Sequence, residues 1–114
     1  MSNKCKLFQN EEKRTSVVIY DNCKYDAYDY ITRRLRCYSA KGILLPNKII
    51  GKSICNPEDT WDSAIGAKEA YRKADRTHQR LMKAAIKYWM KRTINDMRNI
   101  DPEMFDELIK EEEK

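Results

Sequence analysis

Residues 51–76, GKSICNPEDTWDSAIGAKEAYRKADR, decide the fold, because this stretch contains the end of a strand and the start of a helix. Asn56 and Pro57 predict a tight turn between the two, since both residue types favour turn conformations. Thr60 and Asp62 are both suitable N-caps for the helix. Three carboxylates place negative charge where the helix dipole favours it: Glu58, Asp59 and Asp62. We therefore expect a strand-to-helix junction whose acidic helix start repels phosphate.

One apolar stripe runs along the expected helix at spacings of three and four residues. Its members are Ala67, Ala70, Tyr71, Ala74, His78, Leu81, Ala85 and Trp89. A stripe of this kind suits the covering of a sheet, so this side of the helix should form the core. We interpret His78 as a histidine packed at the edge of the core rather than as a catalytic residue.

A second apolar stripe is rotated from the first by more than a quarter turn, at about 100° per residue. Its members are Ile86, Met90, Ile94 and Met97. A helix that is unbroken from Asp62 to about Arg98 is roughly 55 Å long, whereas a strand of ~10 residues spans only about 33 Å. A small sheet cannot cover the second stripe, which therefore needs another surface.

The C-terminal segment 101–113, DPEMFDELIKEEE, is one candidate for that surface. Asp101 predicts an N-cap and Pro102 the first position of a short helix with an apolar face. Three arrangements stay open: the short helix folds back as a hairpin, the apolar residues mediate a homodimer, or they bind a foreign partner. The residues expected to take part in this association are Ile86, Met90, Ile94, Met97, Phe105 and Leu108.

Three segments show strand patterns. Residues 15–20, TSVVIY, and 48–55, KIIGKSIC, are rich in β-branched residues, and residues 30–40, YITRRLRCYSA, alternate between two faces. Short connections between consecutive strands predict an antiparallel meander. The expected fold class is α+β, with a three-stranded antiparallel sheet packed on one long helix and a short C-terminal helix.

Length and composition indicate a single domain. The chain has 114 residues, of which 41% are hydrophobic and 36% charged, and its three Gly and three Pro leave little room for linkers. We expect an N-terminal extension over residues 1–13, a β-β-β-α core over 14–93, and a helical extension with an acidic tail over 94–114. The net charge of +5 favours an anionic partner, although a basic balance also serves solubility alone.

The four cysteines are Cys5, Cys23, Cys37 and Cys55. The chain has no apolar window approaching the ~18 residues of a membrane span, and its N-terminus lacks the apolar core of a signal peptide. We therefore expect a cytoplasmic protein, without a membrane partner, whose thiols are reduced and partly buried. The alternative to reduced thiols is that some of these cysteines form disulfides. No close pair of ligands is present, so neither a metal nor another cofactor is expected.

The junction resembles a signature of small proteins of unknown function from phages, mobile elements and some bacterial chromosomes. The resemblance covers roughly residues 14–90 and rests on Gly51, Cys55, Pro57, Asp59, Trp61, Gly66 and Ala70. It implies the β-β-β-α core of a double-stranded-RNA-binding domain without its first helix, in which Gly66 lets the helix approach the sheet. Such a domain carries lysines at the start of this helix. The chain has carboxylates there, which argues against the standard mode of RNA binding.

Two basic surfaces are candidates for binding an anionic partner, either a nucleic acid or an acidic protein. The first lies opposite the apolar stripe and spans ~34 Å of helix, about one turn of duplex DNA. It consists of Lys68, Arg72, Arg76, Arg80, Lys83, Lys87 and Lys91, and its alternative interpretation is an ordinary solvated helix face. The second comprises Arg34, Arg36 and Tyr38 on the expected strand 30–40, where cross-strand packing is the simpler interpretation.

Catalysis is not expected, because the chain lacks a Ser-His-Asp set and a phosphate-binding glycine-rich loop. The resemblance implies a non-enzymatic phage or mobile-element protein in the host cytoplasm that inhibits or retargets a host protein. An anti-CRISPR-like inhibitor of a host-defence system is one example. Two alternatives stay open: a nucleic-acid-binding accessory protein that uses the basic helix face, and a homo-oligomeric structural subunit.

Overall fold

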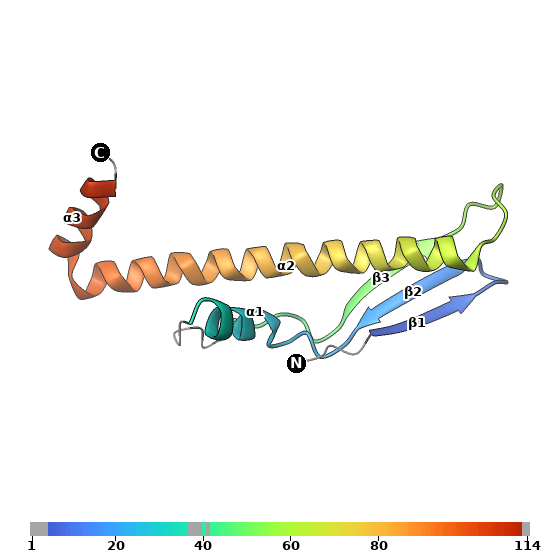
Figure 1. The fold of residues 1–114 in the computed structure, drawn as a ribbon, viewed down its shortest axis with the longest axis horizontal. Helices are drawn as coiled ribbons and strands as arrows, with labels where there is room; N and C mark the ends of the chain where they lie inside the picture. The colour runs from blue at the N-terminus through green and yellow to red at the C-terminus, as the bar shows by residue number, and fades with distance from the viewer. Residues whose placement is uncertain (1–4, 37–39, 41, 113–114) are drawn as a thin grey trace.

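The computed structural model describes residues 5–36, 40 and 42–112, without the side chains at 100, 105, 108, 109, 111 and 112. The elements are β1 (Cys5–Asn10), β2 (Thr15–Tyr20), α1 (Asp26–Asp29), η1 (Tyr30–Arg34), β3 (Ile49–Ile54), α2 (Ser63–Ile100) and α3 (Pro102–Glu112). The strands form an antiparallel sheet in the order β1-β2-β3, which packs on one end of α2 (Figure 1). The α+β class, the three-stranded antiparallel sheet, the long helix and the short C-terminal helix are all confirmed.

One expected strand is wrong, and an N-terminal strand takes its place in the sheet. Residues 30–40 form no strand in their described part, because α1 leads directly into η1, a π-helical turn in which Leu35 N donates to Tyr30 O at 3.3 Å. This turn buries Ile31 completely against α2, so tertiary packing overrides the local strand pattern. β1 lies in the segment expected as an extension over 1–13. The other two expected strands are confirmed as β2 and β3.

Helix α2 lies so close to the sheet that two contact positions must be glycine. A β-carbon on Gly51, in β3, would stand 2.5 Å from the Ala74 nitrogen and overlap the carbonyl oxygen of Ala70. A β-carbon on Gly66, in α2, would overlap the hydroxyl of Ser16, which confirms the expected role of this glycine. The start of α2 is therefore held at a fixed height above the sheet.

Two separate cores line the same side of α2. Near its start, Ala70 and Ala74 pack on Val18 of β2. Farther along, a larger cluster joins α1, η1, the connection to β3 and α2: Ala27, Ile31, Ala40, Ile43, Leu45 and Trp89. The expected apolar stripe is thus confirmed along its length, although Tyr71 remains 37% exposed.

The last turns of α2 extend beyond both cores, and the molecule measures 65 × 30 × 18 Å. The helix continues through residue 93, where we expected the core domain to end, and reaches Ile100. Asp101 Oδ1 then accepts from Met104 N at 3.1 Å, which confirms the expected cap of α3. α3 leaves the end of α2 at a steep angle instead of folding back along it, so the hairpin arrangement is wrong (Figure 1). No described helix combines the length and apolar character that crossing a bilayer requires.

Candidate binding surfaces

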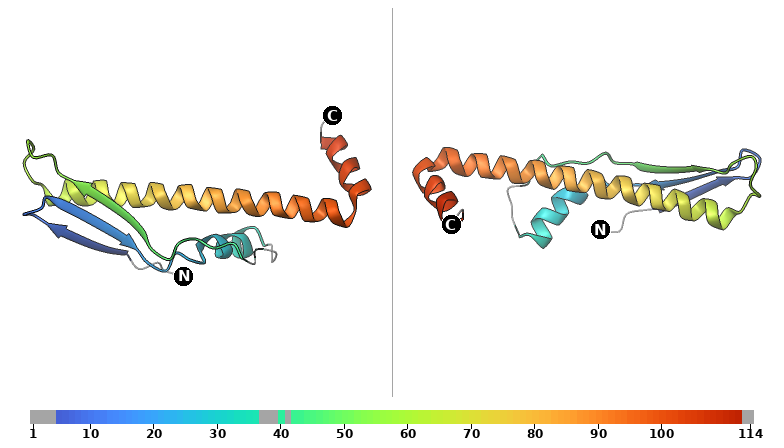
Figure 2. Two further views of the ribbon diagram at one scale, coloured as in Figure 1. Left: turned by 180° about the vertical axis from the view of Figure 1, so that it is seen from behind. Right: turned by 90° about the horizontal axis from the view of Figure 1, so that it is seen from above.

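One face of the sheet is uncovered and apolar, and the sequence pattern did not predict it. Strand register pairs Phe8 with Val17 and Ile19 with Ile50, and side chains two residues apart share a face. These residues lie on the face opposite that of Val18 and Gly51, which contact α2. Helix α2 covers only the face of Val18 and Gly51 (Figure 2). Phe8, Ile50 and Ile54 are 54%, 57% and 65% exposed. We call this surface the open sheet face; it consists of Phe8, Val17, Ile19, Ile50 and Ile54.

The basic face of α2 is present as the sequence predicts. All seven of its members are exposed: Lys68, Arg72, Arg76, Arg80, Lys83, Lys87 and Lys91. One carboxylate, Glu69, lies among them and accepts from Arg72 at 2.7 Å. This neighbouring guanidinium lowers the pKa of Glu69. An exposed pair of this kind contributes little to folding stability. Because Glu69 offsets only one of the seven positive charges, the face keeps a strong positive excess that is available to a partner.

Asp75, an acidic residue beside the basic face, is engaged by the sheet. Tyr20 donates its hydroxyl hydrogen to Asp75, which joins β2 to α2. Burial first, and then this carboxylate, raise the pKa of Tyr20. Next to the face, Lys73 Nζ donates to the Lys52 carbonyl of β3 at 3.0 Å. The side of α2 that meets the sheet is therefore tied down by polar contacts, and the basic face is left to solvent.

The second basic surface does not form as expected. Arg34 is exposed at the end of η1, and Arg36 is exposed in the connection after it, where its φ is 51°. Because the described part of residues 30–40 contains no strand, Arg34 and Arg36 share no strand face there, and the strand arrangement expected for this patch is wrong. Tyr38 lies outside the described residues.

The residues expected to mediate association divide into two groups. Ile86 packs against the larger core and is partly buried. Met90, Ile94 and Met97 stay 49%, 46% and 49% exposed on the part of α2 that lies beyond the sheet. The side chains of Phe105 and Leu108 are not among the described ones. An uncovered apolar stripe of three residues therefore remains on the last part of α2.

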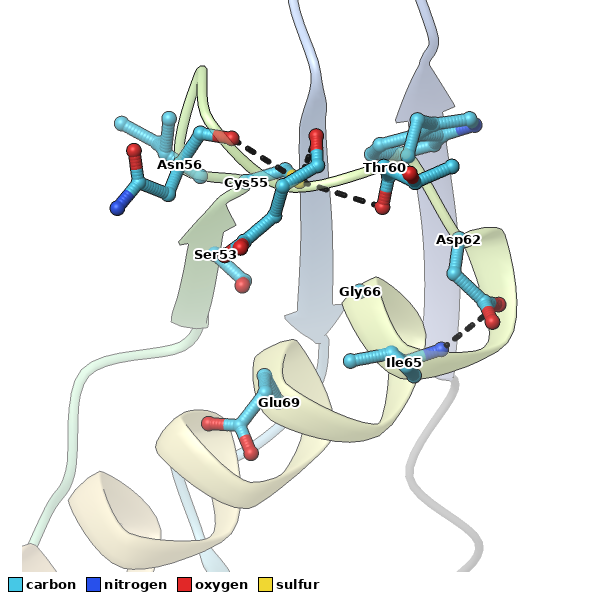
Figure 3. Close-up of a pocket in the computed structure, with 11 residues that line it drawn as sticks. Ser53, Cys55, Asn56, Thr60, Asp62, Ile65, Gly66 and Glu69 are labelled. Atoms are coloured by element: carbon cyan, nitrogen blue, oxygen red, sulfur yellow. Dashed lines mark hydrogen bonds between the residues drawn. The ribbon is translucent and has the colours of Figure 1, made fainter.

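The acidic cap expected at the strand-to-helix junction is present. Asp62 caps α2 by accepting from Ala64 N at 2.9 Å and Ile65 N at 3.4 Å, which confirms its expected role. The guanidinium of Arg14 donates to the backbone carbonyls of Asn56 and Asp59. A hollow of about 340 Å³ beside the junction is lined by residues that include Trp61, Gly66 and Glu69 (Figure 3). The amides that would bind an anion here are occupied by the Asp62 carboxylate.

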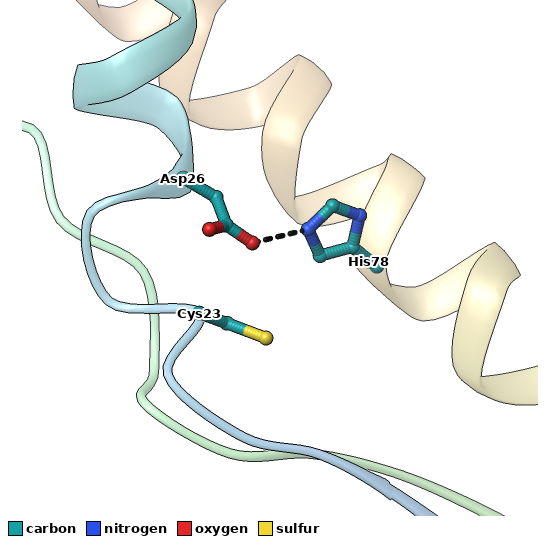
Figure 4. Close-up of side chains that lie close together, drawn as sticks. All are labelled: Cys23, Asp26 and His78. Atoms are coloured by element: carbon teal, nitrogen blue, oxygen red, sulfur yellow. Dashed lines mark hydrogen bonds and ion pairs between the residues drawn. The ribbon is translucent and has the colours of Figure 1, made fainter. Parts of the chain in front are cut away.

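Three potential metal ligands lie together where the loop after β2, the start of α1 and the middle of α2 meet. His78 Nε2 and Asp26 Oδ2 are 2.8 Å apart, and the Cys23 thiol completes the group (Figure 4). Cys23 is fully buried, while the side chains of Asp26 and His78 are 13% and 24% exposed. This placement confirms that His78 packs at the edge of the core. We call this group the Cys-Asp-His cluster.

The Cys23 thiol is held in its neutral form. Burial first, and then the Asp26 carboxylate, raise its pKa to about 11. The sulfur contacts the Tyr20 carbonyl at 3.5 Å, which is a weak hydrogen bond. Among the described cysteines, Cys5 and Cys55 are also free thiols; Cys5 is exposed to solvent and Cys55 is half-buried. Cys37 lies outside the described residues.

Comparison of the chain with protein-family models, with curated proteins and with solved structures finds no significant match. The resemblance to small phage and mobile-element proteins therefore stays a hypothesis. Any functional assignment has to rest on the open sheet face, the basic face of α2, the uncovered end of α2 and the Cys-Asp-His cluster.

Proposed function

We propose that this protein is a non-enzymatic binding protein that inhibits or retargets another protein by docking through the open sheet face. The observation that carries the proposal is the exposure of Phe8, Ile50 and Ile54 on one continuous surface. Contiguous apolar patches of this kind, rimmed by polar residues, are typical of protein interaction sites.

The basic residues on the open sheet face indicate which surface chemistry the partner has. Lys6 and Lys52 share the open sheet face with its apolar residues, and both are exposed. Lys6 lies two residues before Phe8 on the edge strand β1, and Lys52 lies between Ile50 and Ile54 on β3, so apolar and basic side chains alternate on this surface. Aromatic and apolar residues next to charged ones are common at interfaces. The partner therefore presents an apolar surface bordered by carboxylates. The resemblance to phage proteins makes a host protein, for example a component of a defence system, the first one to test.

Capture from a host lysate with the chain as bait, followed by mass spectrometry, identifies the partner. The informative variant is Phe8→Thr with Ile50→Thr, because threonine keeps the strand preference while removing the apolar contact. We expect the partner's affinity to fall by about 30-fold, the effect of losing one interface hot spot. Tyr88→Gln is the matched control, since Tyr88 is 62% exposed on α2, away from the sheet. Equal capture by wild type and the double variant contradicts the proposal.

A nucleic-acid-binding accessory role is the second candidate, and the exposed basic face of α2 favours it. Seven basic residues over ~34 Å of helix suit contacts with successive phosphates rather than with bases. Binding of this kind is independent of sequence and depends steeply on salt. Gel retardation of random duplex DNA and RNA over a salt series tests this role. Strong retardation that is lost as salt rises supports it, and the absence of retardation at low salt contradicts it.

A further inference from the structure

The Cys-Asp-His cluster has the composition of a metal site. Its three potential ligand atoms, one each from Cys23, Asp26 and His78, all lie within 4.8 Å of one another. Cys23 and Asp26 come from the short segment 23–26 after β2, and His78 comes from α2, so two parts of the fold meet at the edge of the larger core (Figure 4). We propose that this cluster binds one zinc ion.

The geometry is close to that of a zinc site. Zinc binds sulfur at about 2.3 Å and nitrogen or oxygen at about 2.0–2.2 Å, so tetrahedral ligand atoms lie roughly 3.3–3.7 Å apart. The Asp26 oxygen and the His78 nitrogen, now 2.8 Å apart, must separate slightly, and the other ligand pairs must close by about 1 Å or less. Small side-chain rotations would accomplish both changes, because the side chains of His78 and Asp26 keep 24% and 13% of their surface exposed.

The ligand types select zinc over the common hard cations. Magnesium and calcium prefer oxygen ligands, and the cluster offers only one carboxylate. Thiolate and imidazole are instead typical ligands of zinc. Within the described residues, no fourth cysteine, histidine or acidic ligand joins the group. Three protein ligands leave a fourth position, which water occupies from the exposed side of His78.

Charge also favours the ion. As zinc binds, the Cys23 thiol loses its proton to solvent and a zinc–sulfur bond forms. The imidazole binds in its neutral form, so the coordinating nitrogen gives up its hydrogen and the other nitrogen carries one. One thiolate and one carboxylate then balance the two positive charges of zinc. A neutral complex suits this place, because Cys23 is fully buried and Asp26 nearly so.

Metal titration of the full chain tests the proposal. Protein stripped with a chelator is titrated with Co²⁺, and we expect one equivalent to produce a thiolate-to-cobalt charge-transfer band together with the visible bands of a tetrahedral ion. Native mass spectrometry should then show a single bound zinc. A zinc concentration a hundredfold above Kd should raise Tm by roughly 10 °C, since the ion binds only the folded chain.

Three variants separate the cluster from adventitious binding. Cys23→Ser should abolish the charge-transfer band, and His78→Gln should weaken zinc affinity by roughly 100-fold or more while keeping the fold, since His78 is only partly buried. Cys55→Ser is the control and should leave the band, the stoichiometry and the shift in Tm unchanged. The proposal is overturned if the wild type gives no charge-transfer band, or if His78→Gln binds zinc as tightly as the wild type.

Discussion

At the scale of single residues, Gly51 shows how closely the long helix approaches the sheet. Its missing β-carbon makes room for the backbone of α2 at Ala70 and Ala74, and backbone atoms cannot rotate away. We predict that Gly51→Ala lowers the free energy of unfolding by about 3 kcal/mol, the upper range for overpacking a tight contact. Urea denaturation measures this effect.

Gly42 is the control for this prediction, because its backbone conformation favours glycine while the space around it would admit a β-carbon. Gly42 has a φ of 85°, and a β-carbon there would come no closer than 3.9 Å to the Arg92 side chain. Gly42→Ala should therefore cost only about 1–2 kcal/mol, the usual penalty of a left-handed backbone. Equal losses in the two variants would show that α2 moves away from the sheet easily.

Cys23 makes the stability of the metal-free protein sensitive to alkaline pH. Its pKa rises from the ordinary thiol value of 9.0 to about 11 in the fold, because burial and Asp26 favour the neutral thiol. The folded chain therefore holds the proton more tightly than the unfolded chain, and the resulting stability is present in full below pH 9. We predict that this contribution is lost as the pH rises from 9 to about 11.

Denaturation of chelator-treated wild type and Cys23→Ser at several pH values isolates the thiol from the other titrating groups. The difference in unfolding free energy between the two proteins should be constant below pH 9 and should decrease above it. A difference that does not change with pH would mean that the thiol is solvated in the folded state.

The residues of the junction were predictable from the sequence, but the Cys-Asp-His cluster was not. Asp62 was predictable as a cap because its partners lie two and three residues away. Asp26 and His78 are instead 52 residues apart, and Cys23 lies three residues before Asp26 without a second cysteine or histidine nearby to form a recognised ligand pair. The topology brings the three together, so no spacing rule could have found them.

At the scale of elements, the basic face of α2 makes a quantitative prediction about salt. If five of its seven cations contact phosphates, the slope of log K against log salt is about −4.5. Neutralising three of them, in Arg76→Gln, Arg80→Gln and Lys83→Gln, should reduce the slope to about −2. Fluorescence anisotropy with a labelled duplex at several salt concentrations measures both slopes.

A charge-matched variant provides the control. Arg33, Arg34 and Arg36 are exposed but lie outside α2. Changing all three to glutamine removes the same net charge and should leave the slope near its wild-type value. If both triple variants reduce the slope equally, attraction is due to net charge and the α2 face has no special role.

The strands show why part of the sheet could not be predicted. All six residues of β1 are exposed, so this edge strand has no alternation between buried and solvated positions. The turn before β2 also lacks a glycine, because Arg14 itself adopts the positive φ of 54°. Residues 30–40 do show alternation, but Ile31 reaches the core from a helical turn instead. The helix was predictable because its stripe and its N-cap are both local features.

At the scale of the whole molecule, the chain is a long helix with two cores along its first part and an uncovered end. That end carries Met90, Ile94 and Met97, each about half exposed. We predict that two copies associate through this stripe, as the structural-subunit alternative requires. Three apolar side chains per copy form a small interface, so the dissociation constant should be weak, roughly 10–100 μM.

Light scattering coupled to size-exclusion chromatography, at loading concentrations on both sides of that range, detects the association as a rise in molar mass. Ile94→Lys with Met97→Lys should keep the protein monomeric, because both changes place charge in the proposed contact. Asn95→Lys with Asn99→Lys adds the same charge at exposed positions on the other side of α2 and should still dimerise. A wild type that stays monomeric at the highest concentration would contradict the predicted association. Loss of the dimer in both variants would attribute the effect to repulsion alone, whereas loss in the first variant only would locate the contact on the uncovered end of α2.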